Sequence, residues 1–287
     1  MIDYKRGCIT VGMISLLKAI SPSSEFHEMK FEEQSFVVVG AARTGGIGLN
    51  FVRELLAIGV EKIAVFDVAD PSEINKLKMQ FGDKAILFHK VDVRNKTEIE
   101  TAFKEVVMTF GYVDVLANIV GICDETKIED TIHVNLCGMI YSTLIGIDQM
   151  SVKNGGHGGM IVNVASVAGL DPFHRCPVYS SSKSGVVAFT RSLSDKILTS
   201  EFGIKFVLIC PGSTKTELLK DTLPKMFGTY DGGEEYNRIM AEYGSQTAEE
   251  CAKSMIQALK ESENGSTWIL DRAKHTAVNF CQYYQMD

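Results

Sequence analysis

Val39-Gly-Ala-Ala-Arg-Thr-Gly-Gly-Ile-Gly48 is the stretch that decides the fold of this chain. It follows the β-rich run Phe36–Val39 and precedes the apolar helical pattern Leu49–Ile58, so it predicts the turn between a buried strand and a helix. Glycines in such a turn let backbone N–H groups approach a pyrophosphate, and the N-terminus of the helix favours its negative charge. The stretch therefore predicts a nucleotide-binding strand–turn–helix unit.

The remainder of the chain repeats this alternation of short apolar runs and amphipathic segments. The runs that predict strands are Phe36–Val39, Ile63–Phe66, Ala85–His89, Val113–Ala117, Ile161–Ala165, Phe206–Ile209 and Thr267–Leu270. Buried strands that alternate with helices predict an α/β fold with right-handed crossovers. We expect a single Rossmann-like, doubly wound parallel sheet of about seven strands, with helices on both faces.

Two helix starts carry specific signals. Asp70-Pro71 predicts an N-cap and a first-turn proline for a helix with Ile74, Leu77 and Phe81 on one face. Thr97 and Glu100 have the spacing of a capping box, which predicts that the next helix begins there.

The chain is expected to form one domain at residues 29–287, with a substrate lid near residues 217–245. Residues 1–28 are expected to be an extension outside the core. Lys5 and Arg6 precede the apolar stretch Cys8–Leu17, so a targeting segment stays open as the alternative, although Lys18 interrupts the pattern.

Composition excludes several classes of function. The net charge of −7 argues against nucleic acid and anionic membranes as partners, and no apolar run approaches the ~18–20 residues that span a bilayer. The seven cysteines are odd in number and lack a Cys-x-x-Cys pair, and the six histidines form no ligand-like pattern. We therefore expect reduced thiols in a cytoplasmic protein and no metal.

Three polar residues at predicted strand ends point to the nucleotide. Asp67 ends the second strand 19 residues after Gly48, where a carboxylate binds an adenosine ribose and repels a 2′-phosphate. This spacing predicts NAD rather than NADP. Asp92 ends the third strand and is a candidate for adenine contact, and Asn118 follows the fourth and is a candidate for the cofactor cleft. The alternative for each is a turn-forming role.

Tyr179 and Lys183 carry the candidate chemistry. They stand four residues apart in Pro177–Ser184, so in a helix both side chains lie on one face. An ammonium group beside a phenol favours the phenolate, which is a base able to take a proton from an alcohol. An isolated pair of this kind has little specificity, so its surroundings decide.

Those surroundings resemble the short-chain dehydrogenase/reductase family, from Met29 to about Leu270. The motifs that carry the resemblance, in chain order, are Gly46-Ile47-Gly48, Asn118-Ile-Val-Gly121, Asn135 in His-Val-Asn-Leu, Ser166 with Tyr179 thirteen residues later and then Lys183, and Pro211-Gly212 followed by Thr214 and Thr216. The cofactor-binding residues that the resemblance and the spacing imply are Gly40, Gly46, Ile47, Gly48, Asp67, Asp92, Val93, Asn118, Tyr179, Lys183, Pro211, Thr214 and Thr216.

The resemblance also implies a mechanism. Tyr179 acts as the general base, and Lys183 lowers its pKa and holds the nicotinamide ribose. Ser166 holds the substrate oxygen, and Asn135 positions a water molecule that relays the proton. The expected reaction is NAD-dependent oxidation of an apolar secondary alcohol to the ketone or aldehyde. An NAD(H)-linked steroid or carbonyl reductase and a non-catalytic binding or storage protein are the alternatives. A homodimer or homotetramer, formed through the helices after the fourth and fifth strands, is implied as well.

Two local similarities narrow the resemblance. Asn154–Ser166 is similar to NAD-dependent 15-hydroxyprostaglandin dehydrogenases, and Asn264–Asp271 is similar to insect-type short-chain alcohol dehydrogenases. The chain departs from the family pattern at Ala42, where the first glycine is expected unless Gly40 serves through an insertion. Ile119 replaces an asparagine, and Cys176 stands where the prostaglandin enzymes are expected to have a substrate-contacting glutamine. With Ser166 and Tyr179, Cys176 is a candidate substrate residue.

Overall fold

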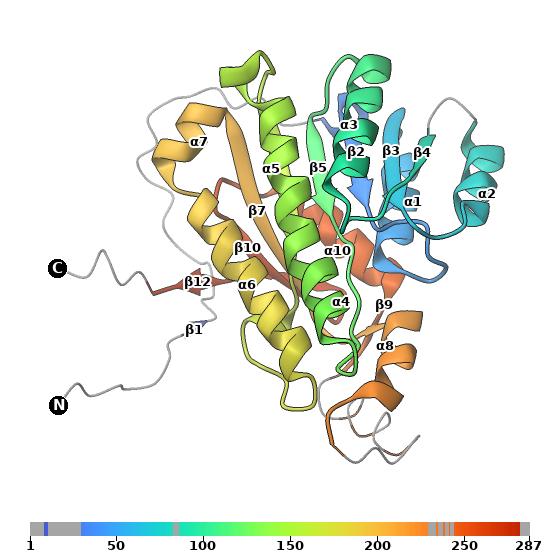
Figure 1. Cartoon of the computed structure of the whole chain (residues 1–287), viewed down its shortest axis with the longest axis vertical. Helices are drawn as coiled ribbons and strands as arrows, with labels where there is room; N and C mark the ends of the chain where they lie inside the picture. Colours follow the sequence, from blue (N-terminus) through green and yellow to red (C-terminus); the bar gives the residue numbers. More distant parts are fainter. Residues whose placement is uncertain are drawn as a thin grey trace.

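A central eight-stranded sheet organises the molecule (Figure 1). The computed structural model describes residues 9–10, 30–82, 86–228, 234, 238, 241 and 244–281. The strands, from one edge of the sheet to the other, are β11 (Lys274–Ala277), β10 (Thr267–Asp271), β7 (Ile204–Pro211), β6 (Gly159–Val164), β5 (Val115–Asn118), β2 (Ser35–Val39), β3 (Lys62–Asp67) and β4 (Ile86–Lys90). All neighbours pair in parallel except β10 and β11. The predicted doubly wound parallel sheet is confirmed, with β11 as an added antiparallel edge strand.

Helices cover both faces of the sheet, as predicted (Figure 1). One face packs against α1 (Ile47–Ala57), α2 (Ser72–Phe81) and α10 (Ala248–Lys260). The other face packs against α3 (Lys96–Phe110), α5 (Met139–Met150) and α6 (Pro177–Leu193). Because both faces are covered, the β2 strand is buried along its whole length, which explains its uninterrupted apolar run.

Shorter elements connect this frame. The short helices are η1 (Phe31–Glu33), α4 (Ile128–Ile132), η3 (His133–Gly138, a π-helix), η4 (Val152–Asn154), η5 (Val167–Gly169), α7 (Lys196–Phe202), α8 (Glu217–Thr222) and η6 (Leu223–Lys225). The two small sheets pair β8 (Thr214–Lys215) with β9 (Gln246–Thr247) and β1 (Ile9–Thr10) with β12 (Asn279–Phe280).

The order of the strands reverses between β2 and β5. Successive strands run outward from this pair in opposite directions, so their connecting segments leave a crevice beyond the carboxyl ends of the strands. Ligands bind at such a reversal in open α/β sheets. The fold therefore places the Gly-rich turn after β2 and the segment after β5 on the two sides of one crevice.

Both helices α2 and α3 begin at residues other than the predicted ones. Pro71, rather than Asp70, is the N-cap of α2, and the Asp70 carboxylate accepts a hydrogen bond from the backbone N–H of Ser72 at 2.9 Å. The prediction that Phe81 shares the buried face was wrong, because it is the last residue of α2 and is 39% exposed. The capping box predicted from Thr97 was also wrong: Asn95 is the cap of α3, two residues earlier.

The predicted extension and lid lie partly outside the described residues. Of residues 1–28 only the strand Ile9–Thr10 is described, and it pairs with Asn279–Phe280. Of the lid, α8 and η6 are described, and most of residues 229–243 are not. Among the described helices, none has both the length and the apolar character that a bilayer span requires.

Candidate active site

A cavity of about 860 Å³ lies at the carboxyl ends of the strands. Its walls come from the turn after β2, the segments after β3, β4, β5, β6 and β7, and helix α8. The predicted site residues that line it are Gly40, Gly46, Ile47, Gly48, Asp67, Asp92, Val93, Ser166, Cys176, Tyr179, Lys183, Pro211, Thr214 and Thr216. Asn118 and Asn135 were predicted with them, and both side chains lie behind the wall.

The Gly-rich turn forms one end of the cavity. At two of its glycines, neighbouring backbone atoms lie where a Cβ atom would be. Gly40 has φ +86°, and a Cβ there would lie 2.5 Å from the Cα of Val120. A Cβ on Gly48 would lie 2.2 Å from the carbonyl oxygen of Gly40. Both positions therefore exclude a side chain. Of the two alternatives for the first glycine, Gly40 has the required geometry, and Ala42 is buried behind the turn.

Asp67 is held at this end of the cavity by the backbone. Its carboxylate accepts hydrogen bonds from the N–H groups of Ala42, at 2.8 Å, and Ala69, at 2.9 Å. Asp92 stands nearby on the cavity wall, where the Arg94 guanidinium holds the pKa of its carboxyl below its usual value. The orientation of both carboxylates on the cavity wall is therefore fixed by neighbouring donors.

Asn118 has a structural role in this protein. Its amide nitrogen donates to Thr143 and to Asn163, and its oxygen accepts from the Ser142 hydroxyl at 2.7 Å. The residue is buried, and the network ties β5 to β6 and α5. Its side chain therefore fixes the strands that carry the site and does not line the cavity.

Helix α6 carries Tyr179 and Lys183 on one face, as the spacing predicts. The Lys183 ammonium is buried, lies 5.8 Å from the centroid of the Tyr179 ring and donates to the carbonyl oxygen of Val164 at 3.0 Å. Burial lowers the pKa of Lys183 to about 8. A Cβ on Gly121 would lie 3.3 Å from the Lys183 amine, so glycine there leaves room beside this group.

Without a bound cofactor, the pKa of Tyr179 is not lowered. Burial raises the pKa of Tyr179 well above 10, while its hydrogen bond with Ser166 opposes that shift. Desolvation therefore opposes the expected effect of Lys183, because burial penalises the phenolate and the ammonium together. A phenolate at Tyr179 near neutral pH requires additional positive charge in the cavity.

Glu125 fixes the start of α6, and the sequence patterns missed it. Its two carboxylate oxygens accept hydrogen bonds from the backbone N–H groups of Val178, at 2.8 Å, and Tyr179, at 2.9 Å. A carboxylate at a helix N-terminus also interacts favourably with the helix dipole. Because Glu125 precedes Tyr179 by 54 residues, no local spacing could have indicated this contact.

Asn135 lies in the π-helix η3 and is 1% exposed. Its amide oxygen accepts from the N–H of Ile122, and its amide nitrogen donates to the Ile122 carbonyl, both at 2.8 Å. The same nitrogen donates to the Ser182 hydroxyl at 3.0 Å. The side chain thus joins the segment after β5 to helix α6, directly behind Lys183.

Asn135→Ala is therefore expected to lower the free energy of unfolding by about 2–4 kcal/mol, because it leaves buried backbone groups of Ile122 unpaired. Urea unfolding followed by circular dichroism measures this. Asn154→Ala, at the exposed end of η4, is the matched control and should change stability by less than about 0.5 kcal/mol. An Asn135→Ala protein as stable as wild type would show that the network does not support the fold.

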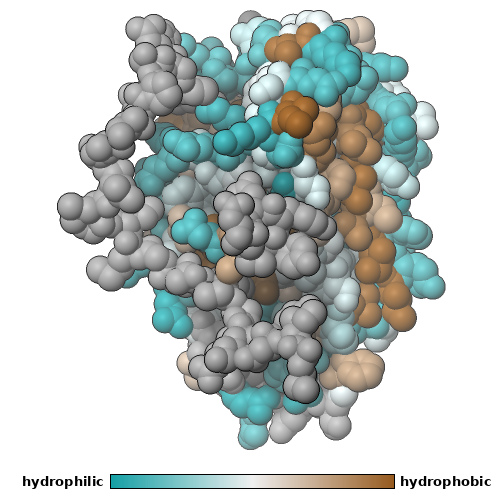
Figure 2. Space-filling model, turned by 90° about the vertical axis from the view of Figure 1, so that its left-hand side faces the viewer, coloured by the Kyte–Doolittle hydropathy of each residue, from teal (hydrophilic) through white to brown (hydrophobic). Residues whose placement is uncertain are grey.

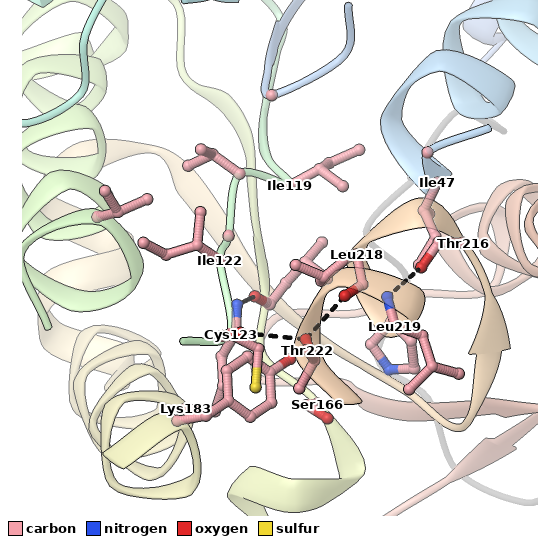
Figure 3. Close-up of a pocket in the computed structure, with 18 of the residues that line it drawn as sticks. Ile47, Ile119, Ile122, Cys123, Ser166, Lys183, Thr216, Leu218, Leu219 and Thr222 are labelled. Atoms are coloured by element: carbon pink, nitrogen blue, oxygen red, sulfur yellow. Dashed lines mark hydrogen bonds between the residues drawn. The ribbon is translucent and has the colours of Figure 1, made fainter. Parts of the chain in front are cut away.

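The far end of the cavity is apolar and is closed by α8. Cys123, Cys176, Leu223 and Met226 form a buried cluster against Tyr179. Figure 3 shows how α8 reaches this end: the Thr222 hydroxyl donates to the carbonyl oxygens of Cys123, at 3.1 Å, and Leu218, at 2.7 Å.

Two ion pairs also hold α8 and η6 over the cavity. Arg43, in the Gly-rich turn, pairs with Asp221, and Lys225 pairs with Asp124 at 3.2 Å. Together with Thr222, these contacts connect α8 and η6 to the Gly-rich turn and to the segment after β5.

The comparisons with known proteins agree with this architecture. A doubly wound sheet with a Gly-rich turn at one end of its cavity is typical of oxidoreductases that use a nicotinamide cofactor. The model of the short chain dehydrogenase family matches residues 34–226, and the chain belongs to this family.

Its relatives include insect alcohol dehydrogenases. The chain is 34% identical over 247 residues to the alcohol dehydrogenase-related 31 kDa protein of Drosophila melanogaster, covering 85% of this chain and 89% of the relative. It is 32% identical over 249 residues to alcohol dehydrogenase 1 of Ceratitis cosyra, covering 86% and 96%. A crystal structure of a short chain dehydrogenase from Bacillus anthracis has the same fold, with a TM-score of 0.67, 20% identity and coverage of 85% and 96%.

Proposed function

We propose that this protein is an NAD-dependent dehydrogenase that oxidises an apolar secondary alcohol. The observation that carries the proposal is the single cavity that joins the Gly40–Gly48 turn to Ser166, Tyr179 and Lys183. The names of the insect relatives support alcohols as substrates. The test is a panel of short alcohols, long secondary alcohols, sterols and prostaglandins with NAD⁺. If no alcohol yields NADH while NAD⁺ binding is retained, the chain is a binding protein instead.

The residues present fit a dinucleotide. Gly40 and Gly48 leave space at backbone that a Cβ would fill, and the N-cap of α1 is Gly46, which has no side chain to cap the helix. The helix end is thus left for a phosphate group. Asp67 would hold the adenosine ribose, and Lys183 the nicotinamide ribose. When bound, NAD⁺ accepts a hydride at the nicotinamide ring and adds a positive charge to the cavity.

The chain's own residues handle the proton. The Tyr179 phenolate accepts the proton of the substrate hydroxyl, and the Ser166 hydroxyl donates a hydrogen bond to the substrate oxygen. The buried Lys183 ammonium stabilises the phenolate, and its pKa of about 8 lets it exchange a proton near neutral pH. Glu125 holds the backbone of Tyr179 in place during this transfer.

The substrate end of the cavity selects for apolar alcohols. Phe173, Leu218 and Met226 line the cavity and belong to the apolar cluster that includes Tyr179. Burial of an apolar substituent there contributes about 0.8 kcal/mol per methylene group, so longer secondary alcohols should bind more tightly than ethanol.

Asp67→Asn is expected to raise the KM for NAD⁺ by about 10–100-fold, because the variant loses a hydrogen bond to a charged acceptor while keeping the side-chain shape. It should also make NADP⁺ a usable cofactor, since the carboxylate no longer repels a 2′-phosphate. Steady-state kinetics with both cofactors measures this. Asp70→Asn, an exposed carboxylate outside the cavity lining, is the matched control. Unchanged NAD⁺ preference in Asp67→Asn would remove this residue from cofactor recognition.

One observation favours carbonyl reduction as a second candidate function. The raised pKa of Tyr179 disfavours the phenolate in the protein alone, and a protonated phenol is the acid that carbonyl reduction uses. Turnover of steroids and other carbonyl compounds with NADH, compared with turnover of the alcohol panel with NAD⁺, separates the two candidates. Turnover confined to carbonyl substrates would favour the reductase, and turnover confined to the alcohol panel would favour the dehydrogenase.

We also propose that the protein self-associates through α5 and α6. Leu144 on α5 is 47% exposed, and a band of hydrophobic surface runs along the side of the molecule that carries these helices (Figure 2). Exposed apolar surface of this kind favours a protein partner. Light scattering coupled to gel filtration tests this: a dimer or tetramer that Leu144→Lys converts to monomer is the expected result.

A further inference from the structure

Three metal-ligating side chains meet at the substrate end of the cavity. They are Cys123 and Glu125, which follow β5, and Cys176, which precedes α6. The two Sγ atoms and a carboxylate oxygen of Glu125 all lie within 4.8 Å of one another. Cys123 and Cys176 also line the cavity, and Figure 3 shows the sulfur of Cys123 on the same side of it as Ser166 and Lys183.

The geometry suits a small thiophilic cation. Zinc binds thiolate at about 2.3 Å and carboxylate at about 2.0–2.2 Å, so neighbouring ligand atoms of a tetrahedral site are roughly 3.5–3.8 Å apart. Ligand atoms within 4.8 Å need to approach by at most about 1.3 Å, which side-chain rotation can supply. Each oxygen of Glu125 accepts one backbone N–H, and a carboxylate oxygen has a second lone pair for a metal.

We propose that Cys123, Glu125 and Cys176 form a three-ligand site for a thiophilic divalent cation such as Zn²⁺. Binding replaces the two thiol protons, which are released to solvent, and forms two metal–sulfur bonds and one metal–oxygen bond. The fourth position of the metal faces the cavity beside Tyr179. An occupied site therefore obstructs the alcohol and leaves the Gly-rich end free, so the metal inhibits the enzyme at the substrate side.

The carboxylate of Glu125 favours metal binding at this site over simple disulfide formation between the two cysteines. A carboxylate is a metal ligand and takes no part in a disulfide. Burial also favours specificity, because Cys123 and Cys176 are 8% and 3% exposed and can be reached only from the cavity. A metal that enters the cavity meets the two thiols on its wall, with a Glu125 oxygen within 4.8 Å of both sulfur atoms.

Direct metal binding tests the proposal without any need for turnover. The full chain, reduced and freed of metal with a chelator, is titrated with Zn²⁺ by calorimetry at constant pH. One equivalent should bind, and Cys123→Ser and Cys176→Ser should each weaken the affinity by at least about tenfold. Cys281→Ser removes an exposed thiol outside the cavity and is the matched control, expected to bind as wild type.

Two further measurements identify the ligands and the consequence. Co²⁺ in place of Zn²⁺ should give a thiolate-to-cobalt absorption that weakens in each cavity variant and persists in Cys281→Ser. In the active enzyme, Zn²⁺ should raise the KM for the alcohol and leave NAD⁺ binding unchanged. Thermal unfolding checks that the variants fold, with Cys123→Ala and Cys176→Ala as replacements if a serine variant does not.

Equal Zn²⁺ affinity in wild type and the Cys123→Ser/Cys176→Ser double variant would overturn the proposal, as would wild type without stoichiometric binding. A further outcome is that the protein binds Zn²⁺ through both cysteines and yet turns over no alcohol. That result would support the metal site and would contradict only the proposed dehydrogenase function.

Discussion

Tyr179→Phe is expected to lower kcat for alcohol oxidation by about 10²–10⁴-fold, because it removes the group that accepts the hydroxyl proton. The phenyl ring keeps the contacts that Tyr179 makes with the buried cluster around Cys176 and Met226. The affinity for NAD⁺ and the unfolding temperature should therefore change little, so the loss is confined to the chemical step.

Stopped-flow measurement of NADH formation, with the best alcohol of the panel, checks this result. Tyr112→Phe is the matched control: it also removes one phenol, but Tyr112 precedes β5, at the opposite end of the sheet from the cavity. Its kcat should equal that of wild type. Turnover by Tyr179→Phe within tenfold of wild type would mean that another group takes the proton.

Lys183→Met is expected to abolish most activity and to stabilise the fold at neutral pH. Activity should fall by at least about 100-fold, because the phenolate loses its nearby cation. Stability should rise because burial of the ammonium, which lowers the pKa of Lys183 from 10.5 to about 8, costs about 3 kcal/mol. Loss of the hydrogen bond to Val164 offsets about 1 kcal/mol of this, so a net gain of about 2 kcal/mol is expected.

The stability gain has a defined pH dependence. Between pH 8 and 10.5 the unfolded chain binds the Lys183 proton and the folded protein does not, so the stability of wild type rises with pH in this window. The buried ammonium lowers the free energy of unfolding by its full amount below pH 8. Above pH 10.5 Lys183 is neutral in both states, so it has no such effect. The advantage of Lys183→Met should therefore be largest at pH 7 and disappear by about pH 10.5.

Urea unfolding of both proteins at several pH values provides the measurement. Lys196→Met, on the exposed side of α7, serves as the control and should show no such trend. A Lys183→Met protein that is less stable than wild type at pH 7 would mean that the ammonium makes stabilising contacts that outweigh its desolvation.

Sequence patterns predicted the features that depend on neighbours along the chain. The Gly-rich turn, its strand and its helix are contiguous, so their order predicted the turn that forms one end of the cavity. Tyr179 and Lys183 are one helical turn apart, and the helix alone brings them to one face. The parallel sheet follows in the same way, since its central strands β2, β5, β6 and β7 are short buried runs.

Contacts between distant segments could not be predicted in this way. Glu125 reaches the start of α6 because β5 and β6 are neighbours in the sheet. The buried partners of the Asn118 amide are 24 to 45 residues away along the chain, so local spacing could not reveal them. For this reason the sequence predicted Asn118 at the cavity rather than behind its wall. The turn from β10 to β11 uses Arg272 and Ala273 at positive φ, where glycine or asparagine is usual, so the edge strand gave no turn signal.

The carboxylate of Glu125 has an evolutionary consequence. It holds the tyrosine by the main chain, through N–H groups that every amino acid except proline provides. The substrate wall, in contrast, is built by side chains of α8 and η6, which connect to the site through Thr222 and Lys225. Substitutions in that wall can therefore reshape this end of the cavity without removing the contact that holds the backbone of Tyr179.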